Sequence, residues 1–343
     1  MFSLILRTAL PVFSFILWTG CASKPRSPLA KGTRPVQLSA SHAGEGPVWS
    51  PDWNTPSGVL FYVGDHRISR FTPGKASRTF RSPVKGANGL LIDPQGRLLC
   101  CEAGNRRVTR LEKDGSLTVL ASSLGAQKFN SPNDLCMDSK QRIYFTDPRY
   151  GNRDSMEMTD QHGRKIEGVY RIDSPGKVQR ILGPESVNRP NGILVSPDDR
   201  FLYVADNNNT EGGVRKLWRF ALNTDGIADA ASRTLIFDWK TSRGPDGLKM
   251  DVENRIFVAA GLNKPNPPHE SSTPYPGGVY ILSERGRLLD FIPVPTDEVT
   301  NCAFGGKEMK TLFITAGGSL WSIQTNAPGY PTAPFATARR KPE

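Results

Sequence analysis

The sequence has little histidine and little cysteine. Only four His and five Cys occur among 343 residues, and none of them shows the C-x-x-C or H-x-x-x-H spacing of a zinc site. The motif G-x-S-x-G is also absent, and no histidine stands where it could activate a serine. These absences argue against a zinc enzyme and against hydrolysis by a serine nucleophile.

The sequence also lacks long apolar stretches with the 3.6-residue periodicity of helices. Glycine (33 residues) and proline (28 residues) instead interrupt the chain at short intervals, which is typical of many short strands joined by turns. Length alone leaves one domain or two open, because all-β architectures often exceed about 250 residues as a single domain. We therefore expect an all-β protein.

A basic run interleaved with aromatic residues is missing too. The 44 Lys and Arg exceed the 33 Asp and Glu, which gives a formal charge of +11, but they are scattered along the chain. A nucleic-acid site would need them clustered. We interpret the charge as a solvated basic surface and expect no nucleic-acid partner, while an anionic substrate or membrane surface remains an alternative.

The N-terminal stretch Thr8–Trp18 is apolar, and at about a dozen residues it is too short to span a membrane. Its length fits a signal peptide over residues 1–20. The following Cys21 resembles the lipidated cysteine of bacterial lipoproteins, although ordinary secretion is the alternative, and residues 21–34 then read as a flexible tether. We expect an exported protein, either a periplasmic or a cell-envelope lipoprotein, that meets a membrane only through this lipid anchor.

The other four cysteines lie far from any metal-binding motif. Two are adjacent in an apolar strand and must face opposite sides of it. We favour buried small apolar side chains as their role, although an exported compartment would also permit a disulfide. They are Cys100, Cys101, Cys136 and Cys302.

Six segments of the sequence share one pattern. Each begins with an acid or an amide, continues as an apolar strand, turns, and enters a second apolar strand; in five of them a basic residue opens that second strand. The segments start at Glu45, Asn88, Asn133, Asn191, Asp246 and Asn301, and the basic residues are Arg97, Arg142, Arg200, Arg255 and Lys310. A period of about 43 to 58 residues is that of a repeat architecture.

Each segment continues into a third short strand, and five of the six have a fourth. Four strands per repeat predict a six-bladed β-propeller with four-stranded blades, because a helical solenoid would need amphipathic helices. The sixth repeat lacks a clear fourth strand, while residues 35–39 form an unassigned N-terminal strand. We predict that this strand completes the last blade and closes the ring, so that the propeller covers residues 35–330 and residues 331–343 form a tail.

The first strand of every propeller blade lines the central channel, so the six opening residues should converge at one mouth of it. Turn formation is the simpler explanation of any single Asn or Asp before a strand. Six in register, all carboxylates or amides, instead favour a hard divalent cation, with Ca²⁺ first, Mg²⁺ or Mn²⁺ next and Zn²⁺ least favoured. His42 and His269 are the two histidines that could face the mouth, although both also fit surface loops.

The repeats contain the phrases EGPVW (45–49), SPND (131–134), FTDPRYG (145–151), RPNG (189–192), GPDG (244–247) and TNCAFGG (300–306). Through these phrases, residues 44–323 resemble the gluconolactonase and senescence-marker-protein (regucalcin) family of six-bladed, metal-dependent lactonases.

The resemblance implies that Glu45, Asn191 and Asp246 are metal ligands. Asn133 matches an asparagine that binds either the metal or the substrate, and Ser131 stands where some animal members have a sugar-binding arginine. The remaining candidates for substrate contact are Asn88, Tyr150, His269 and Asn301.

The resemblance implies a Ca²⁺-dependent hydrolase that opens a small-molecule sugar lactone to the aldonic acid, and we expect it to be a monomer. The metal would polarise the carbonyl, and Asp246 would act as general acid and base, with Glu45 as the fallback. Hydrolysis of phosphotriesters or aryl esters at the same site is one alternative. A non-catalytic sugar-binding propeller is another, since the fold does not fix the function.

Overall fold

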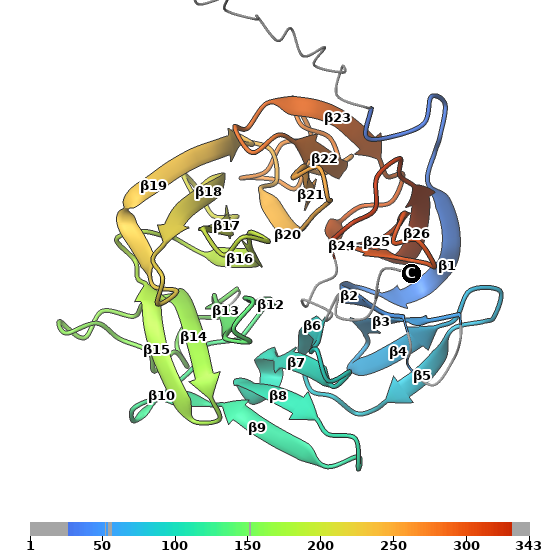
Figure 1. The fold of residues 1–343 in the computed structure, drawn as a ribbon. Helices are drawn as coiled ribbons and strands as arrows, with labels where there is room; N and C mark the ends of the chain where they lie inside the picture. Colours follow the sequence, from blue (N-terminus) through green and yellow to red (C-terminus); the bar gives the residue numbers. More distant parts are fainter. Residues whose placement is uncertain (1–26, 52, 54–56, 151, 331–343) are drawn as a thin grey trace, which may run out of the picture.

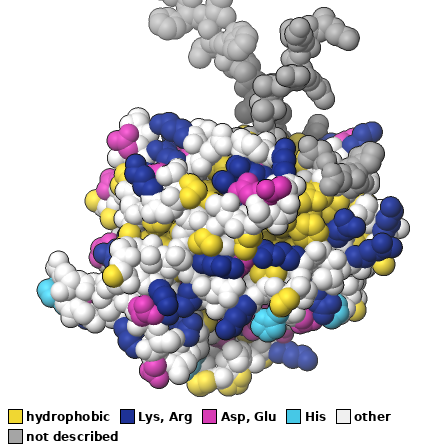
Figure 2. Space-filling view, turned by 90° about the horizontal axis from the view of Figure 1, so that it is seen from below, with side chains coloured by type: hydrophobic (Ala, Val, Ile, Leu, Met, Phe, Trp, Pro, Cys, Tyr) yellow, Lys and Arg dark blue, Asp and Glu magenta, His cyan; other side chains and the backbone are white. Residues whose placement is uncertain are grey.

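The computed structural model describes residues 27–51, 53, 57–150 and 152–330. The predicted signal peptide, Cys21, most of the tether and the C-terminal tail lie outside the described residues. No helix within the described part is long and apolar enough to cross a membrane. On the face shown in Figure 2, Lys and Arg side chains are spread among acidic and uncharged ones rather than gathered in one patch.

Six four-stranded antiparallel sheets surround a central axis, which confirms the predicted six-bladed propeller (Figure 1). In each of blades 1 to 5 the chain runs outward from the axis, strand by strand. The first three blades comprise β2 (Glu45–Ser50), β3 (Val59–Gly64), β4 (Arg67–Phe71) and β5 (Arg78–Arg81); β6 (Ala87–Ile92), β7 (Leu98–Glu102), β8 (Arg107–Leu111) and β9 (Leu117–Ala121); and β12 (Leu135–Met137), β13 (Ile143–Asp147), β14 (Gly168–Ser174) and β15 (Lys177–Leu182).

The last three blades follow the same order, with one exception at the end of the chain. They comprise β16 (Pro190–Val195), β17 (Phe201–Asn207), β18 (Arg215–Leu222) and β19 (Ala228–Asp238); β20 (Pro245–Met250), β21 (Ile256–Ala260), β22 (Gly278–Leu282) and β23 (Leu288–Pro293); and β24 (Val299–Gly305), β25 (Thr311–Ala316), β26 (Gly318–Gln324) and β1 (Val36–Ala43). A short 3₁₀ helix (Ala103–Asn105) and the small hairpin β10 (Ser123–Leu124) and β11 (Gln127–Lys128) lie in connections.

The N-terminal strand closes the ring, as predicted. β1 pairs antiparallel with β26, and Val36 lies opposite Ser322. The strand continues to Ala43, beyond the predicted 35–39. Because the two ends of the chain share one sheet, blade 6 is completed without leaving β26 as an open edge.

Apolar side chains fill the spaces between neighbouring blades, and each of six core clusters joins two adjacent sheets. The adjacent cysteines of β7 show how successive side chains of a strand pack against different neighbouring blades. Cys100 packs toward blade 1 and Cys101 toward blade 3, as opposite faces of one strand require. All four described cysteines are free and buried, in agreement with the role expected from the sequence.

In the five repeats that carry it, the basic residue pairs with an acid in the first turn of its blade. In blades 2, 3 and 5 a buried aspartate accepts hydrogen bonds from backbone amides of the turn and from the arginine four residues later. In blade 3, Arg142 Nε lies 2.6 Å from Asp138 Oδ2. The pattern therefore marks a turn that joins the two inner strands of a blade, at the end remote from the candidate site.

We expect Asp138→Ala to lower the free energy of unfolding by about 3–5 kcal/mol, because it leaves the half-buried Arg142 and two turn amides without their partner. Asp198→Ala is a matched control, since Asp198 makes the corresponding pair with Arg200 with 48% of its side chain exposed. An exposed pair contributes about 0–1 kcal/mol. Urea denaturation of both variants checks this, and equal losses would contradict it.

Candidate metal and substrate site at the propeller axis

The ring residues stand at or near the starts of the six innermost strands, which surround the axis in Figure 1. In four repeats the next residue is glycine, and two of these glycines show how closely the strands approach. A Cβ on Gly192 would lie 2.1 Å from the carbonyl oxygen of Asp246, and one on Gly247 would lie 2.0 Å from Asn301 Oδ1. Glycine therefore lets each inner strand press against the ring residue of the next blade.

Contacts across the ring join residues far apart in sequence. Asn301 Nδ2 donates to Glu45 Oε2 over 3.4 Å, which links the last blade to the first. Asn133, Asn191, Asp246 and Asn301 are all at least nine-tenths buried, while Asn88 is half-buried. The acids and amides of the six repeats thus stand at the same end of the six inner strands, the end called the mouth below.

Three carboxylates share this mouth and repel one another. Burial is the main cause that raises the pKa of Glu45 well above its usual value, and the charges of Asp246 and Asp134 raise it further. Burial raises the pKa of Asp246 to about 8, partly offset by the Arg243 guanidinium. Burial also raises the pKa of Asp134, against the opposing charge of Lys249. Without a cation, the site therefore holds more negative charge than its surroundings stabilise.

Sequence reasoning did not select Asp134 as a site residue. It follows the ring residue Asn133, where four other repeats have glycine. Its side chain is buried, Oδ1 accepts from the Leu135 amide over 2.9 Å, and Oδ2 has no hydrogen-bond partner within the described part of the chain. The acid in place of glycine was the available signal, because a buried carboxylate is costly unless it is paired or bound to a cation.

The donor set fits a divalent cation. Asp246 Oδ1 and Asp134 Oδ2 are both buried with no hydrogen-bond partner among the described residues, and such oxygens are costly unless a ligand satisfies them. The described residues contain no group of three or more His, Cys, Asp or Glu side chains that could hold a metal ion. A cation at the axis would therefore need amide oxygens of the ring as well, and an all-oxygen set suits Ca²⁺.

Tyr150 lies beside the ring residue Asn191. Asn191 Nδ2 donates to the tyrosine hydroxyl over 3.0 Å, and the hydroxyl donates to the carbonyl of Asn207 over 3.0 Å. The aromatic ring of Tyr150, a candidate for substrate contact, lies under the Arg189 guanidinium, whose Cζ is 5.4 Å from the ring centroid. The hydroxyl thus contacts the candidate metal ligand directly.

The two candidate histidines differ in their surroundings. His42 lies on the N-terminal strand, where Nδ1 pairs with the exposed Asp65 rather than with a ring residue. His269 is half-exposed, and its described hydrogen bond is through its carbonyl oxygen, which accepts from Arg215 over 2.9 Å. Substrate contact by His269 stays a prediction.

The segment around His269 is a tethered loop of blade 5. Asp297 accepts from the amides of Asn263 and Lys264 over 2.5 and 2.9 Å. Within the loop, Glu270 is buried and lies 3.7 Å from Arg243 Nε. Since the Arg243 charge acts on Asp246, this loop lies near the mouth, where it can form one wall for a substrate.

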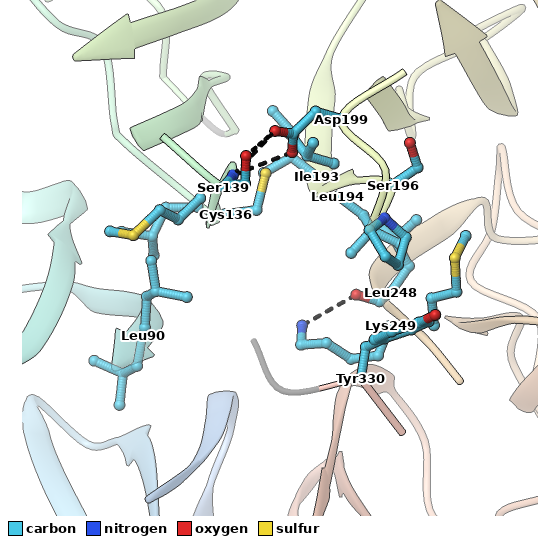
Figure 3. Close-up of a pocket in the computed structure, with 16 residues that line it drawn as sticks. Leu90, Cys136, Ser139, Ile193, Leu194, Ser196, Asp199, Leu248, Lys249 and Tyr330 are labelled. Atoms are coloured by element: carbon cyan, nitrogen blue, oxygen red, sulfur yellow. Dashed lines mark hydrogen bonds between the residues drawn. The ribbon is translucent and has the colours of Figure 1, made fainter. Parts of the chain in front are cut away.

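A separate cavity of about 310 Å³ lies deeper along the same inner strands (Figure 3). Its lining includes Leu90, Leu135, Ile193 and Leu248, each two residues beyond a ring position, and Ser139 of the remote turn. This lining is mostly apolar and lacks the carboxylates of the mouth. The cavity therefore belongs to the opposite end of the channel from the ring residues.

Comparison with known proteins gives one family for this chain. The model of the SMP-30/gluconolactonase/LRE-like region matches residues 43–318. A gluconolactonase of Zymomonas mobilis is 28% identical, over 86% of this chain and 82% of its own length. A pentonolactonase of Haloferax volcanii is 26% identical, over 83% and 85% respectively.

Solved structures of similar proteins agree with this family match. A gluconolactonase from Xanthomonas campestris superposes with a TM-score of 0.70 at 27% identity, covering 87% of this chain and 91% of its own. A protein titled as a calcium-binding regucalcin from Agrobacterium tumefaciens superposes with a TM-score of 0.61 at 19% identity, covering 85% and 96%. At 19% identity, the likeness to the regucalcin structure shows the fold alone.

Proposed function

The chain belongs to the SMP-30/gluconolactonase/LRE-like family, and we propose that it is a hydrolase that opens a sugar lactone to the aldonic acid with the help of a divalent cation, Ca²⁺ first among the candidates. The relatives named gluconolactonase and pentonolactonase support the reaction class. The observation that carries the proposal is the buried mouth itself, where three mutually repelling carboxylates meet amide side chains and two carboxylate oxygens lack a partner among the described residues.

Glu45, Asn191 and Asp246 would hold the cation, with Asn133 as a fourth ligand or as a substrate contact. A bound divalent cation supplies Lewis-acid polarisation of the lactone carbonyl. The protein's own contribution is to bring the donors together around the axis and to keep bulk water from them, since four of the ring residues are at least nine-tenths buried.

Asp246 is the proposed proton carrier. Its Oδ1 has no hydrogen-bond partner in the described part of the chain, so this oxygen is free to take a proton from the attacking water. The water oxygen bonds to the carbonyl carbon, the ring C–O bond breaks, and the proton passes from Asp246 to the departing alkoxide. Glu45 is the other carboxylate of the ring and the alternative base.

Parallel assays on three substrates test this function. Purified protein is given glucono-1,5-lactone, a homoserine lactone and an aryl phosphotriester, each with Ca²⁺ and with EDTA. Turnover of the sugar lactone that EDTA abolishes supports the proposal. Preferred turnover of the phosphotriester would replace it with the esterase alternative, and binding of sugar without any turnover would make the protein a binder.

The cellular location and oligomeric state remain proposals. We propose that the monomeric enzyme is exported and lipid-anchored at Cys21. Cys21→Ser should move most of the protein from the membrane fraction to the soluble envelope fraction, because one acyl-bearing residue is the only membrane contact expected. Fractionation with immunoblotting measures this. Wild-type protein that is already in the soluble envelope fraction would favour ordinary secretion.

A further inference from the structure

The hydrogen bonds of Tyr150 have a fixed direction. A tyrosine hydroxyl carries one hydrogen. Tyr150 donates that hydrogen to the backbone carbonyl of Asn207 over 3.0 Å, and a carbonyl can only accept. The hydroxyl oxygen therefore has only lone pairs left for its second neighbour, the side-chain amide of Asn191, 3.0 Å away.

This direction decides how the Asn191 amide is turned. Only the NH₂ end of an amide can donate to the hydroxyl, so Nδ2 must face Tyr150 and Oδ1 must face elsewhere. The assignment does not depend on telling oxygen from nitrogen by shape, because the neighbouring donors and acceptors impose it. Asn191 is 5% exposed, so bulk water offers the amide little alternative.

The Asn207 carbonyl, which accepts from Tyr150, is itself held in place. The Asn207 amide donates to the carbonyl of Arg189 over 3.0 Å. The buried carboxylate of Asp206 accepts from the amides of Asn188 and Arg189 over 2.9 and 2.6 Å. The backbone two residues before Asn191 is thus tied to the strand end that presents the Asn207 carbonyl.

We propose that Tyr150 is a positioning residue that keeps the side-chain oxygen of Asn191, rather than its nitrogen, available to a divalent cation at the axis. The inference rests on the proposed function in one respect, that Asn191 is a cation ligand. A hard cation binds the carbonyl oxygen of an amide and is repelled by its NH₂ group. The Asp246 carboxylate also accepts from the Asn191 side chain, so the tyrosine hydroxyl is one of two acceptors that hold the NH₂ group. Without the hydroxyl this hold weakens, and a fraction of the protein then presents the wrong end.

Calcium titration calorimetry on the full chain tests the proposal with the pair Tyr150→Phe and Tyr144→Phe. Both substitutions remove one tyrosine hydroxyl. That of Tyr144 lies 3.0 Å from both Asp138 Oδ2 and the Gly226 carbonyl oxygen in the remote turn, and it can donate its one hydrogen to either of them. We expect Tyr150→Phe to weaken Ca²⁺ binding about 10- to 100-fold, the usual cost of losing a group that orients a metal ligand. Tyr144→Phe should leave the dissociation constant within about twofold.

A double-mutant cycle with Asn191→Asp isolates the orientation effect. A carboxylate presents an oxygen whichever way it turns, so Tyr150→Phe should change Ca²⁺ affinity by no more than about twofold in the Asn191→Asp background. A loss as large there as in the wild-type background would overturn the proposal, and so would equal losses from the two phenylalanine variants. The cycle remains informative if Tyr150→Phe is less stable alone, because the same change is made in both backgrounds.

The same measurements separate this inference from the proposed function. Wild-type protein that binds no Ca²⁺, Mg²⁺ or Mn²⁺ would overturn both. Wild-type protein that binds Ca²⁺ through the Tyr150-dependent site but leaves the sugar lactone intact would overturn the lactonase function and support the role of Tyr150. Normal lactone turnover with a Tyr150→Phe affinity equal to wild type would overturn the role of Tyr150 alone.

Discussion

Asp246→Asn is expected to fold and to lose nearly all lactone hydrolysis. An amide cannot take a proton from water, and loss of a general base costs about 10²- to 10⁴-fold in rate. The substitution is nearly isosteric and removes one of three repelling buried carboxylates, so the fold should not suffer. The measurement is kcat on glucono-1,5-lactone at saturating Ca²⁺, with circular dichroism to verify folding.

Asp290→Asn serves as the matched control for this experiment. Asp290 is a half-buried aspartate on the outermost strand of the same blade, and its described side-chain hydrogen bond is from the Phe291 amide. It should keep wild-type kcat. Near-wild-type turnover by Asp246→Asn in protein shown to contain metal would remove Asp246 from the reaction and transfer the role of base to Glu45.

The fold could be predicted from the sequence because the same local pattern of strand and turn occurs in six segments. Each copy has an apolar inner strand and a turn, and in blades 2, 3 and 5 the turn is closed by an aspartate and a basic residue. Each of these features is local. The closure by β1 was also predictable, since one unpaired strand and one incomplete blade remained.

The sequence predicted the site less completely, because a side chain's role depends on neighbours from other blades. Asp134 was not selected from the sequence, and only its approach to Glu45 and Asp246 identifies it as a third carboxylate of the mouth. Tyr150 was a candidate for substrate contact, and the sequence did not reveal that its hydroxyl bridges Asn191 and Asn207. Such contacts join residues 41 and 57 positions apart, which periodicity cannot reveal.

Asp134→Asn should stabilise the metal-free protein but not the Ca²⁺-bound protein. In EDTA the variant should be more stable than wild type by about 1–2 kcal/mol, because one buried charge no longer repels Glu45 and Asp246. In saturating Ca²⁺ it should lose that advantage, since a less negative mouth binds the cation about tenfold or more weakly. Thermal unfolding in EDTA and in Ca²⁺, with calorimetric Ca²⁺ titration, measures both.

Lys249→Gln is the control of opposite sign, because the Lys249 charge lowers the pKa of Asp134 and so opposes the carboxylate repulsion. Removing the positive charge of Lys249 should destabilise the metal-free protein and tighten Ca²⁺ binding. A purely structural role for Asp134 predicts instead that Asp134→Asn is destabilising in EDTA and in Ca²⁺ alike. A stability difference between Asp134→Asn and wild type that depends on Ca²⁺ is therefore the signature of a cation that binds among buried carboxylates. The wild-type protein itself should gain about 2.7 kcal/mol at a Ca²⁺ concentration 100 times its dissociation constant.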